Sequence, residues 1–383
     1  MHASTLDPLD HDPFNQGAGG HHGPGKPRTD TYTATTPDTA GHEPDPDGRA
    51  AALLDRARTL VEPALRTAVS TLPPAMRRIA AYHLGWQHPD GAPARADSGK
   101  ALRPALVLAA ATALGAPPAT AVPAAAAVEL IHNFTLLHDD VMDRDATRRH
   151  RPTAWSLFGA ADVILAGDAL HALALRQLAH DTHPAATAAT ARLAACVIEL
   201  CEGQHEDCAF ETRSHVTLTE CLAMAQAKTG ALLGAACALG ALYATAAPEA
   251  VEAMDGFGRT VGLAFQLADD LIGIWGDPAV TGKPAGSDLA ARKKSLPVVA
   301  ALASGSRAAT DLAALYRDPA PMTAHQVRAA ADAVDRAGAR AWAHLQAAEH
   351  MSAAIDHLTR ATPDLDGAED LLTLAELATR RDR

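Results

Sequence analysis

The chain has 383 residues, of which 48% are hydrophobic and only 4% aromatic, and its formal net charge is −12. This composition provides a large core of alanine and leucine rather than aromatic rings, and such residues favour closely packed helices. The negative charge excludes nucleic acid as a main partner, because a phosphate backbone binds basic surfaces. Five cysteines without CxxC spacing indicate a reducing compartment, so we expect a cytoplasmic protein without disulfide bonds.

The beginning of the chain differs in composition from the rest. Residues 1–49 are rich in proline, glycine, aspartate and histidine and show no apolar periodicity, so we expect a disordered tail. This segment lacks the charged stretch followed by an apolar run that is typical of a secretory signal. We expect residues 50–383 to form one all-α domain.

Apolar residues recur at helical spacing from residue 50 onward. A first helix is expected from residue 50 to the PP pair at 72–73, and a second in AMRRIAAYHLGW after it. Turn sequences such as GAPP, HRPT and RDPAP separate the segments that follow. The further expected helices are 100–114, 123–148, 160–180, 186–212, 217–245, 248–275, 295–304, 308–316, 324–359 and 366–381. No stretch of about 18 or more strongly apolar residues is evident, so we expect no membrane span.

One expected helix, 186–212, carries several residues of the types that bind metals. Cys201, His205 and Cys208 lie on roughly one of its faces. One interpretation is that these three side chains form a metal clip. We favour the other, in which the cysteines are small buried residues, because free cysteine is among the most buried residue types.

The same segment, CEGQHEDCAFE (201–211), also contains a polar series at helical spacing. Its members are Gln204, Asp207 and Glu211. They line the mouth of a cavity, where they would order water or a metal ion, or they form a polar seam between helices. The spacing alone does not separate these two interpretations.

The sequence LLHDDVMDRDATRRHRPT (136–153) places three aspartates at the end of an apolar helix and a run of arginines after them. Asp139 and Asp143 are i,i+4 neighbours with Asp140 adjacent, and like charges at that spacing repel. A hard divalent cation reverses this cost, and Mg²⁺ accepts carboxylates together with water and phosphate oxygens. The alternative is a solvated helix end, which the apolar lead-in AAAAVELIHNFTLL disfavours.

A second acidic pair, Asp269 and Asp270, ends the apolar helical run FGRTVGLAFQLADD. If the two acidic clusters face each other across a cavity, they hold several Mg²⁺ ions between them, and several Mg²⁺ ions indicate a diphosphate. Basic residues stand near both clusters, and those in GKALRP begin an expected helix, where amides and cations together favour phosphate. Each basic residue alone is most simply a surface charge, but their joint presence beside the aspartates indicates a diphosphate site.

Five motifs in this order resemble those of the trans-isoprenyl diphosphate synthases, also called the polyprenyl synthetase family. They are GKALRP (99–104), ELIHNFTLLHDD (129–140), HDDVMD (138–143), KTG (228–230) and FQLADD (265–270). The resemblance extends over about residues 55–380. It implies an all-α isoprenoid-synthase fold, a helical bundle around a deep central cavity, usually in a homodimer. It also implies head-to-tail condensation of isopentenyl diphosphate with an allylic diphosphate.

The resemblance also implies roles for individual residues. Mg²⁺ on the allylic diphosphate would be held by Asp139, Asp140, Asp143, Asp269 and Asp270. Charge would be drawn onto the leaving diphosphate by Arg148, Lys228 and Lys283. Isopentenyl diphosphate would be bound by Lys100, Arg103, His132 and Arg149. Thr229 and Gln266 would lie beside the allylic cation. Lys293 would lie near a closing lid.

The second acidic motif departs from the family pattern. It reads DDLIG, so Gly273 stands where the family commonly has its last aspartate. Asp277, in the turn WGDP, either replaces that aspartate or caps the turn, and we favour the turn. Loss of one carboxylate would weaken a metal site, but the remaining aspartates and lysines still predict activity.

The residues before the first aspartate motif act in this family as the floor of the product cavity. Phe134 lies five positions before Asp139, roughly 7.5 Å along a helix, and Thr135 follows it. A single aromatic at this place, without an insertion in the motif, resembles geranylgeranyl diphosphate synthases and predicts a C20 product. Alternatively Phe134 is an ordinary core aromatic, and the product is C15 or longer than C20.

Two other functions share some of these features. A class I terpene cyclase also ionises a prenyl diphosphate with aspartate-bound Mg²⁺, but it has no second diphosphate to hold and no need of Lys100, Arg103 and His132. The chain could also be a non-catalytic regulatory subunit. Only the missing last aspartate of the second acidic motif favours this function, and the otherwise complete set of basic diphosphate-binding residues opposes it. The sequence therefore predicts a prenyl diphosphate synthase.

Overall fold

The computed structural model describes residues 46–96, 99–277, 285–318, 320–362 and 364–379. The expected tail therefore lies outside the described residues, except for its last positions, which are helical. Helix α1 (Pro46–Ser70) begins before the expected domain start. Proline suits the first turn of a helix, and Asp47 beside it interacts favourably with the helix dipole, so the helix extends into the polar segment.

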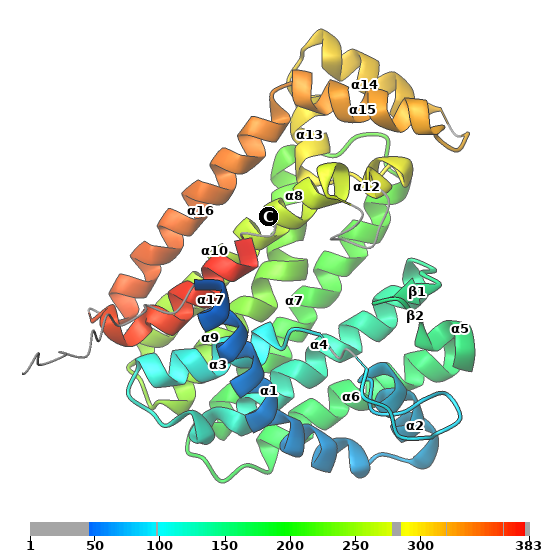
Figure 1. The fold of residues 1–383 in the computed structure, drawn as a ribbon. Coiled ribbons are helices and arrows are strands. Elements are labelled where there is room, and N and C mark those ends of the chain that lie inside the picture. Colours follow the sequence, from blue (N-terminus) through cyan, green and yellow to red (C-terminus); the bar gives the residue numbers. More distant parts are fainter. Residues whose placement is uncertain (1–45, 97–98, 278–284, 319, 363, 380–383) are drawn as a thin grey trace, which may run out of the picture. The chain divides into compact units, whose positions relative to one another are not determined.

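The described residues are almost entirely helical (Figure 1). The remaining α-helices are α2 (Pro74–His83), α3 (Leu102–Ala113), α4 (Val122–Met142), α5 (Ala154–Phe158), α6 (Ala160–Ala179), α7 (Ala186–Thr212), α8 (Leu218–Ala225), α9 (Ala231–Tyr243), α10 (Pro248–Trp275), α12 (Ser287–Ala290), α13 (Leu296–Ala303), α14 (Arg307–Arg317), α15 (Ala324–Arg336), α16 (Ala339–Ala361) and α17 (Glu369–Thr379). Shorter elements are the 3₁₀ turns η1 (Pro118–Ala121) and η3 (Asp366–Ala368), the π-helical turn η2 (Gln226–Gly230), and the strands β1 (Thr147–Arg148) and β2 (Arg151–Pro152).

The long helices pack side by side through small residues. Helix α10 packs against α9 and α16, α4 packs against α6, and α3 packs against α9 (Figure 1). Gly240 of α9 lies against the Val107 carbonyl of α3, and Gly258 of α10 lies against the Leu233 carbonyl of α9. A Cβ atom at either glycine would collide with that backbone, so the close approach of the helices depends on glycine there. The all-α bundle expected from the sequence is confirmed.

The helix expected over 123–148 is shorter than predicted. Helix α4 ends at Met142, and the chain then turns back in a two-stranded antiparallel hairpin, β1–β2. The residues between the strands, Arg149 and His150, have φ of 50° and 59°. Positive φ at both positions matches the twist of a tight hairpin, but such turns usually contain asparagine or glycine. The sequence HRPT indicated a turn at this place, but the helix before it was expected to continue to residue 148, whereas α4 ends at Met142.

The helix expected over 324–359 is two helices. Helix α15 ends at Arg336, and Gly338 adopts a left-handed conformation with φ of 79° before α16 begins. A glycine just past the last helical turn is a common helix stop, because a residue without a side chain adopts positive φ at little cost. The apolar spacing continues across this break, which is why the pattern predicted one long helix.

Two helical stretches among the described residues are long and apolar enough to cross a membrane by length and composition alone. They are Pro118–Met142 and Leu218–Tyr243, with 67% and 72% of their most apolar window buried inside the protein. Both carry residues of the expected site, and buried core helices of this kind meet the same length and hydropathy criteria.

Candidate active site

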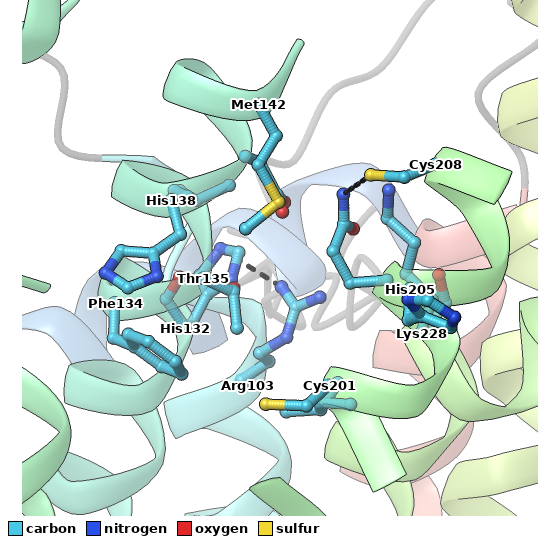
Figure 2. A pocket seen from close by; sticks show the side chains of 15 residues that line it. Arg103, His132, Phe134, Thr135, His138, Met142, Cys201, His205, Cys208 and Lys228 are labelled. Carbon is cyan, nitrogen blue, oxygen red and sulfur yellow. Dashed lines mark hydrogen bonds between the residues drawn. The ribbon is translucent and has the colours of Figure 1, made fainter. Parts of the chain in front are cut away.

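A cavity of about 400 Å³ lies between α3, α4, α7 and η2. Its polar lining includes Arg103, His132, Asp139 and Lys228, and its apolar lining includes Phe134, Leu136, Met142 and Leu200. Figure 2 shows Phe134 and His138 on one side of this space, with Lys228 and His205 across from them. The volume and the mixed lining are typical of a small-molecule site.

The first acidic end, Asp139, Asp140 and Asp143, closes α4. Asp140 is 1% exposed, and its Oδ1 accepts a 2.7 Å hydrogen bond from Nε of Arg148. Its Oδ2 is also buried and has no hydrogen-bond partner among the described residues. Burial raises the pKa of Asp139 to about 6, although the nearby Lys228 acts in the opposite direction. These carboxylates are thus short of positive charge and hydrogen-bond donors.

The second acidic end, Asp269 and Asp270, lies near the C-terminal end of α10, which ends at Trp275. Asp270 is 2% exposed, and both of its oxygens are engaged by the protein. The backbone N–H of Leu296 donates to Oδ2 at 2.8 Å, and Nε2 of Gln266 donates to Oδ1 at 2.9 Å. Burial raises the pKa of Asp270 to about 6, with Lys293 opposing it. Asp269, by contrast, is exposed.

Lys228, Lys293 and Asp207 lie between or beside the two acidic ends. The Nζ of Lys228 lies 2.5 Å from Oδ2 of Asp207 on α7, and the Nζ of Lys293 lies 3.8 Å from Oδ1 of Asp270. Desolvation alone would lower the pKa of Lys228, but Asp207 and Asp139 outweigh it and raise that pKa. Asp207 also helps to raise the pKa of Lys293. Both acidic ends therefore belong to one continuous polar region.

A second set of basic groups lies on the other side of the first acidic end. The Nη1 of Arg103 lies 3.2 Å from Nε2 of His132, as Figure 2 shows. Burial, followed by the charges of Arg103 and Arg149, holds the pKa of His132 well below its ordinary value. A neutral His132 accepts the hydrogen bond from Arg103 at Nε2. The Arg149 guanidinium packs against Gly99, next to the exposed Lys100.

The KTG motif lies in a distorted part of one long helical stretch. The segment expected at 217–245 is helical throughout, but η2 inserts a π-helical turn between α8 and α9. Such turns frequently occur at functional sites. This turn directs Lys228 and Thr229 into the cavity, where the Thr229 hydroxyl donates a 2.7 Å hydrogen bond to Oε1 of Gln266. Thr229, Gln266 and Asp270 thus form a continuous hydrogen-bonded chain.

Phe134 and Thr135 both line the cavity, as expected for its floor. Phe134 is 7% exposed and is held by two histidine rings. The His171 ring of α6 stacks on it at 5.3 Å between centroids, and the His138 ring meets it edge-on at 4.7 Å. His138 fits there because Gly167 of α6 has no side chain to collide with it.

The cysteine interpretation is correct in part. Cys196, Cys221 and Cys237 are buried, but Cys201 is exposed and Cys208 is half-buried, and both line the cavity. They are not part of a metal clip in the described residues, where no group of three or more histidine, cysteine, aspartate or glutamate side chains is arranged to hold an ion. Cys208 instead accepts a hydrogen bond from Gln204, with 3.5 Å between Nε2 and Sγ.

The donor set of the acidic ends fits Mg²⁺. Mg²⁺ usually takes one or two protein carboxylates and completes its octahedron with water and substrate phosphate, so it does not require a cage of three protein ligands. Asp140 presents a buried carboxylate oxygen without a hydrogen-bond partner in the described part of the chain, and burial also raises the pKa of Asp143. A divalent cation would relieve both features.

Comparisons with known proteins agree with this geometry. The sequence profile of the family described as Polyprenyl synthetase matches residues 94–334. The chain belongs to the polyprenyl synthetase family. It is 51% identical over 332 residues to a geranylgeranyl diphosphate synthase of Mycobacterium tuberculosis, covering 86% of this chain and 94% of that protein. It is 46% identical over 343 residues to a (2E,6E)-farnesyl diphosphate synthase of Mycobacterium bovis, covering 87% and 96%.

Solved structures of polyprenyl synthetases share the fold. A polyprenyl synthetase from Streptomyces coelicolor A3(2) superposes with a TM-score of 0.82 at 44% identity, covering 86% of this chain and 99% of that one. A geranylgeranyl pyrophosphate synthetase from Pyrococcus horikoshii gives a TM-score of 0.78 at 31% identity, covering 87% and 98%. As a member of the polyprenyl synthetase family, the chain is a trans-prenyltransferase with the all-α isoprenoid-synthase fold.

Most of the predicted site residues of this polyprenyl synthetase lie in or beside the cavity, and three more residues join them. Lys283 lies outside the described residues. Asp207 pairs with Lys228, His171 supports Phe134, and Asp288 pairs with Lys293. Of these only Asp207 had a sequence indication, its helical spacing from Gln204. Glu211, the third member of that polar series, is exposed.

Proposed function

We propose that this polyprenyl synthetase condenses isopentenyl diphosphate head-to-tail with allylic diphosphates to give geranylgeranyl diphosphate. The observation that carries the proposal is that members of two sets of diphosphate-binding groups line one cavity, Asp139 and Lys228 from the first set and Arg103 and His132 from the second. The acidic ends with Lys228 suit the allylic diphosphate, and Arg103, His132 and Arg149 suit the second substrate. A terpene cyclase has no use for this second set.

The acidic ends would hold several Mg²⁺ ions, and Asp139, Asp143 and Asp269 are the carboxylates most open to them. Asp270 accepts hydrogen bonds from the protein at both oxygens, so it would support the ions through the surrounding structure, whereas Asp140 accepts one at Oδ1 and would offer Oδ2 to an ion. Bound Mg²⁺ would supply Lewis-acid neutralisation of the diphosphate charge.

The protein's own cations would stabilise the developing diphosphate charge. Lys228 and Arg148 stand beside the first acidic end, and Lys293 beside the second. Charge stabilisation by preorganised groups in an enclosed site commonly lowers the activation barrier more than any other catalytic effect. We assign the same role to Lys283.

The allylic cation would lie beside Thr229 and Gln266. The Thr229 hydroxyl donates its hydrogen to Gln266, so the lone pairs of its oxygen remain available to a positive charge in the cavity. The apolar lining next to them would exclude water that could otherwise trap the cation. Isopentenyl diphosphate, held by Lys100, Arg103, His132 and Arg149, would present its double bond to this cation.

The C20 product length rests on Phe134. Its ring is fixed between His138 and His171 on the cavity floor, which stops the growing chain. Replacing Phe134 with alanine should lengthen the product beyond C20, because the floor is removed. Leu136→Ala, at another lining position, serves as the control for a general loss of packing. A product distribution unchanged by Phe134→Ala would refute the floor.

A direct assay tests the function. Purified protein is incubated with Mg²⁺, labelled isopentenyl diphosphate and one of three primers, dimethylallyl, geranyl or farnesyl diphosphate, and the dephosphorylated products are sized by chromatography. We expect geranylgeraniol. Absence of condensation with every primer would contradict the proposal and favour a regulatory subunit.

Farnesyl diphosphate synthesis is the second candidate, because one relative of nearly full-length similarity is named a farnesyl diphosphate synthase. The same assay separates the two products. If farnesol is the final product and a farnesyl primer is not elongated, the C20 proposal is wrong. The condensation with isopentenyl diphosphate would still be correct.

We further propose a cytoplasmic homodimer. Leu157 of α5 and Ile164 and Leu165 of α6 are large apolar residues with 43%, 40% and 51% exposure, and α5 packs on α6. Contiguous exposed apolar residues of this kind mark association surfaces. Size-exclusion chromatography with light scattering should give twice the monomer mass, and Leu165→Glu should reduce it to that of a monomer.

A further inference from the structure

The proposed site residues all lie outside α14 and α15, yet these two helices pack on α12 and α13 (Figure 1). A separate apolar cluster joins the four helices. Its members include Leu289 of α12, Val298 of α13, Leu312 of α14 and Val334 of α15. The turn between α12 and α13 carries Lys293, whose Nζ lies 3.8 Å from Oδ1 of Asp270. The pair α14–α15 is therefore packed against the two helices that flank a site residue.

The turn between α12 and α13 has a strained backbone. Arg292 has a φ of 54°, in the left-handed region. A residue with a side chain disfavours this conformation and keeps it only where the surrounding contacts enforce it. The turn directs the side chain of the next residue, Lys293, toward Asp270 and its carbonyl oxygen toward α14.

The end of α14 supplies contacts that enforce this conformation. The Tyr316 hydroxyl donates a 3.2 Å hydrogen bond to the Lys293 carbonyl oxygen. The Arg292 guanidinium donates from Nε to the Leu315 carbonyl oxygen at 3.4 Å and from Nη2 to the Ala320 carbonyl oxygen. Carbonyl groups in the last turn of a helix lack a partner within the helix and favour a cation. Both residues of the turn are thus bonded to the end of α14.

The residue after Lys293 is held by a different part of the bundle. The Nζ of Lys294 donates a 2.5 Å hydrogen bond to the Phe210 carbonyl oxygen of α7, and the Lys294 carbonyl oxygen accepts a 3.4 Å hydrogen bond from Sγ of Cys221. The two successive lysines therefore point in different directions, Lys294 toward α7 and Lys293 toward Asp270. The conformation of the turn decides that Lys293 faces the second acidic end.

We propose that Tyr316 and Arg292 are positioning residues, which hold the turn so that Lys293 faces the second acidic end. This inference rests on the proposed function, in which Lys293 stabilises the negative charge of a diphosphate at that end. Helix α14 then acts on the reaction through the backbone of Lys293, without touching the substrate.

The test measures diphosphate binding and compares two tyrosines. Thermal unfolding of the full chain in saturating MgCl₂ is followed while inorganic diphosphate is titrated, for the wild type, Tyr316→Phe and the control Tyr243→Phe. The diphosphate concentration at half-maximal stabilisation should rise about 3- to 10-fold for Tyr316→Phe, the range expected for loss of one hydrogen bond. The Tyr243 hydroxyl donates to Asp181 at the end of another helix pair, so Tyr243→Phe should keep the wild-type midpoint.

A double-mutant cycle tests whether the effect passes through Lys293. Lys293→Met removes the ammonium group and should raise the same midpoint by about 10-fold or more, since a bond to a charged group is lost. In the Lys293→Met background Tyr316→Phe should have no further effect, because no cation remains to be positioned. Equal effects of Tyr316→Phe in both backgrounds would overturn the proposal.

Arg292→Gly tests the other positioning residue. Glycine adopts the positive φ without strain, so this variant loses the guanidinium and its hydrogen bonds to α14 while the turn remains allowed. The diphosphate midpoint should rise about 3- to 10-fold in the wild-type background. It should not rise further in the Lys293→Met background. An effect that persists there would show that Arg292 acts through its own charge, which contradicts a positioning role.

The outcomes separate this inference from the proposed function. If inorganic diphosphate with Mg²⁺ does not stabilise the wild type, the proposed function fails and this inference fails with it. If the wild type is stabilised and Tyr316→Phe has the same midpoint, only the positioning inference is overturned. Lower stability of Tyr316→Phe without diphosphate, at an unchanged midpoint, would also overturn it, because Tyr316 would then support only the fold.

Discussion

The two acidic ends of the cavity share one arrangement within their aspartate pairs. In each pair the second aspartate, Asp140 or Asp270, is almost fully buried and hydrogen-bonded by the protein, whereas the first, Asp139 or Asp269, is more exposed. An adjacent pair on a helix points in two directions, about 100° apart. The motif thus combines a carboxylate that faces the ligand with one that anchors the surrounding structure.

The two ends differ in the residue that stands one helical turn after the first aspartate. Asp143 follows Asp139 by one helical turn, so the first end is contained in a single helix terminus. The second end has Gly273 at the equivalent turn and Asp288 from a separate helix beside it. The comparison shows that a carboxylate beside an aspartate pair can come from the same helix or from a neighbouring one, and that only the first kind is visible as a sequence motif.

The largest expected effect separates the ligand-facing carboxylate of a pair, Asp139, from an ordinary surface carboxylate. Asp139→Asn should lower kcat by about 10²- to 10³-fold, because a group that stabilises transition-state charge is lost. Its metal-free stability should not fall, since a buried charge is removed. Labelled isopentenyl diphosphate incorporation and urea unfolding measure these two quantities. Asp332→Asn, on the exposed face of α15, should change neither.

The next effect tests the anchoring role. Asp270→Ala should lower the free energy of unfolding by about 1–3 kcal/mol, because the buried N–H of Leu296 and the Gln266 side chain lose their acceptor. Asp269→Ala, at the exposed neighbour, should change it by less than about 0.5 kcal/mol. Urea unfolding without metal compares them. Equal losses for both variants would show that the two aspartates do not divide their roles.

The last effect concerns the dependence of stability on pH. Asp139 and Asp270 have a pKa of about 6 in the folded protein, above the ordinary value of 3.8. Between these values the folded protein binds more protons than the unfolded chain, so metal-free stability should fall as pH rises from about 4 to about 6. We expect a loss of about 2 kcal/mol from each of the two groups. Asp139→Asn should flatten part of this slope, and an unchanged slope would show that Asp139 is not desolvated.

Local patterns predicted most of this molecule, and long-range contacts account for what they missed. The apolar spacing predicted α7 and α10 with their observed ends, because buried helices repeat the same face along their length. A turn was indicated by HRPT, but the β1–β2 hairpin was missed because Arg149 and His150 adopt positive φ without the residues that are usual in hairpin turns. Asp288 and His171 were missed because their roles depend on which helices meet.

The central claim is that the two acidic ends act together on one diphosphate. The most direct measurement is incorporation of labelled isopentenyl diphosphate by the purified full chain, with a farnesyl diphosphate primer, as a function of MgCl₂ concentration. We predict no incorporation in the presence of EDTA. The rate of incorporation should rise with a reaction order in Mg²⁺ greater than one, and this order should be lower for Asp269→Asn. Incorporation that persists in EDTA, or an order in Mg²⁺ unaffected by Asp269→Asn, would contradict it.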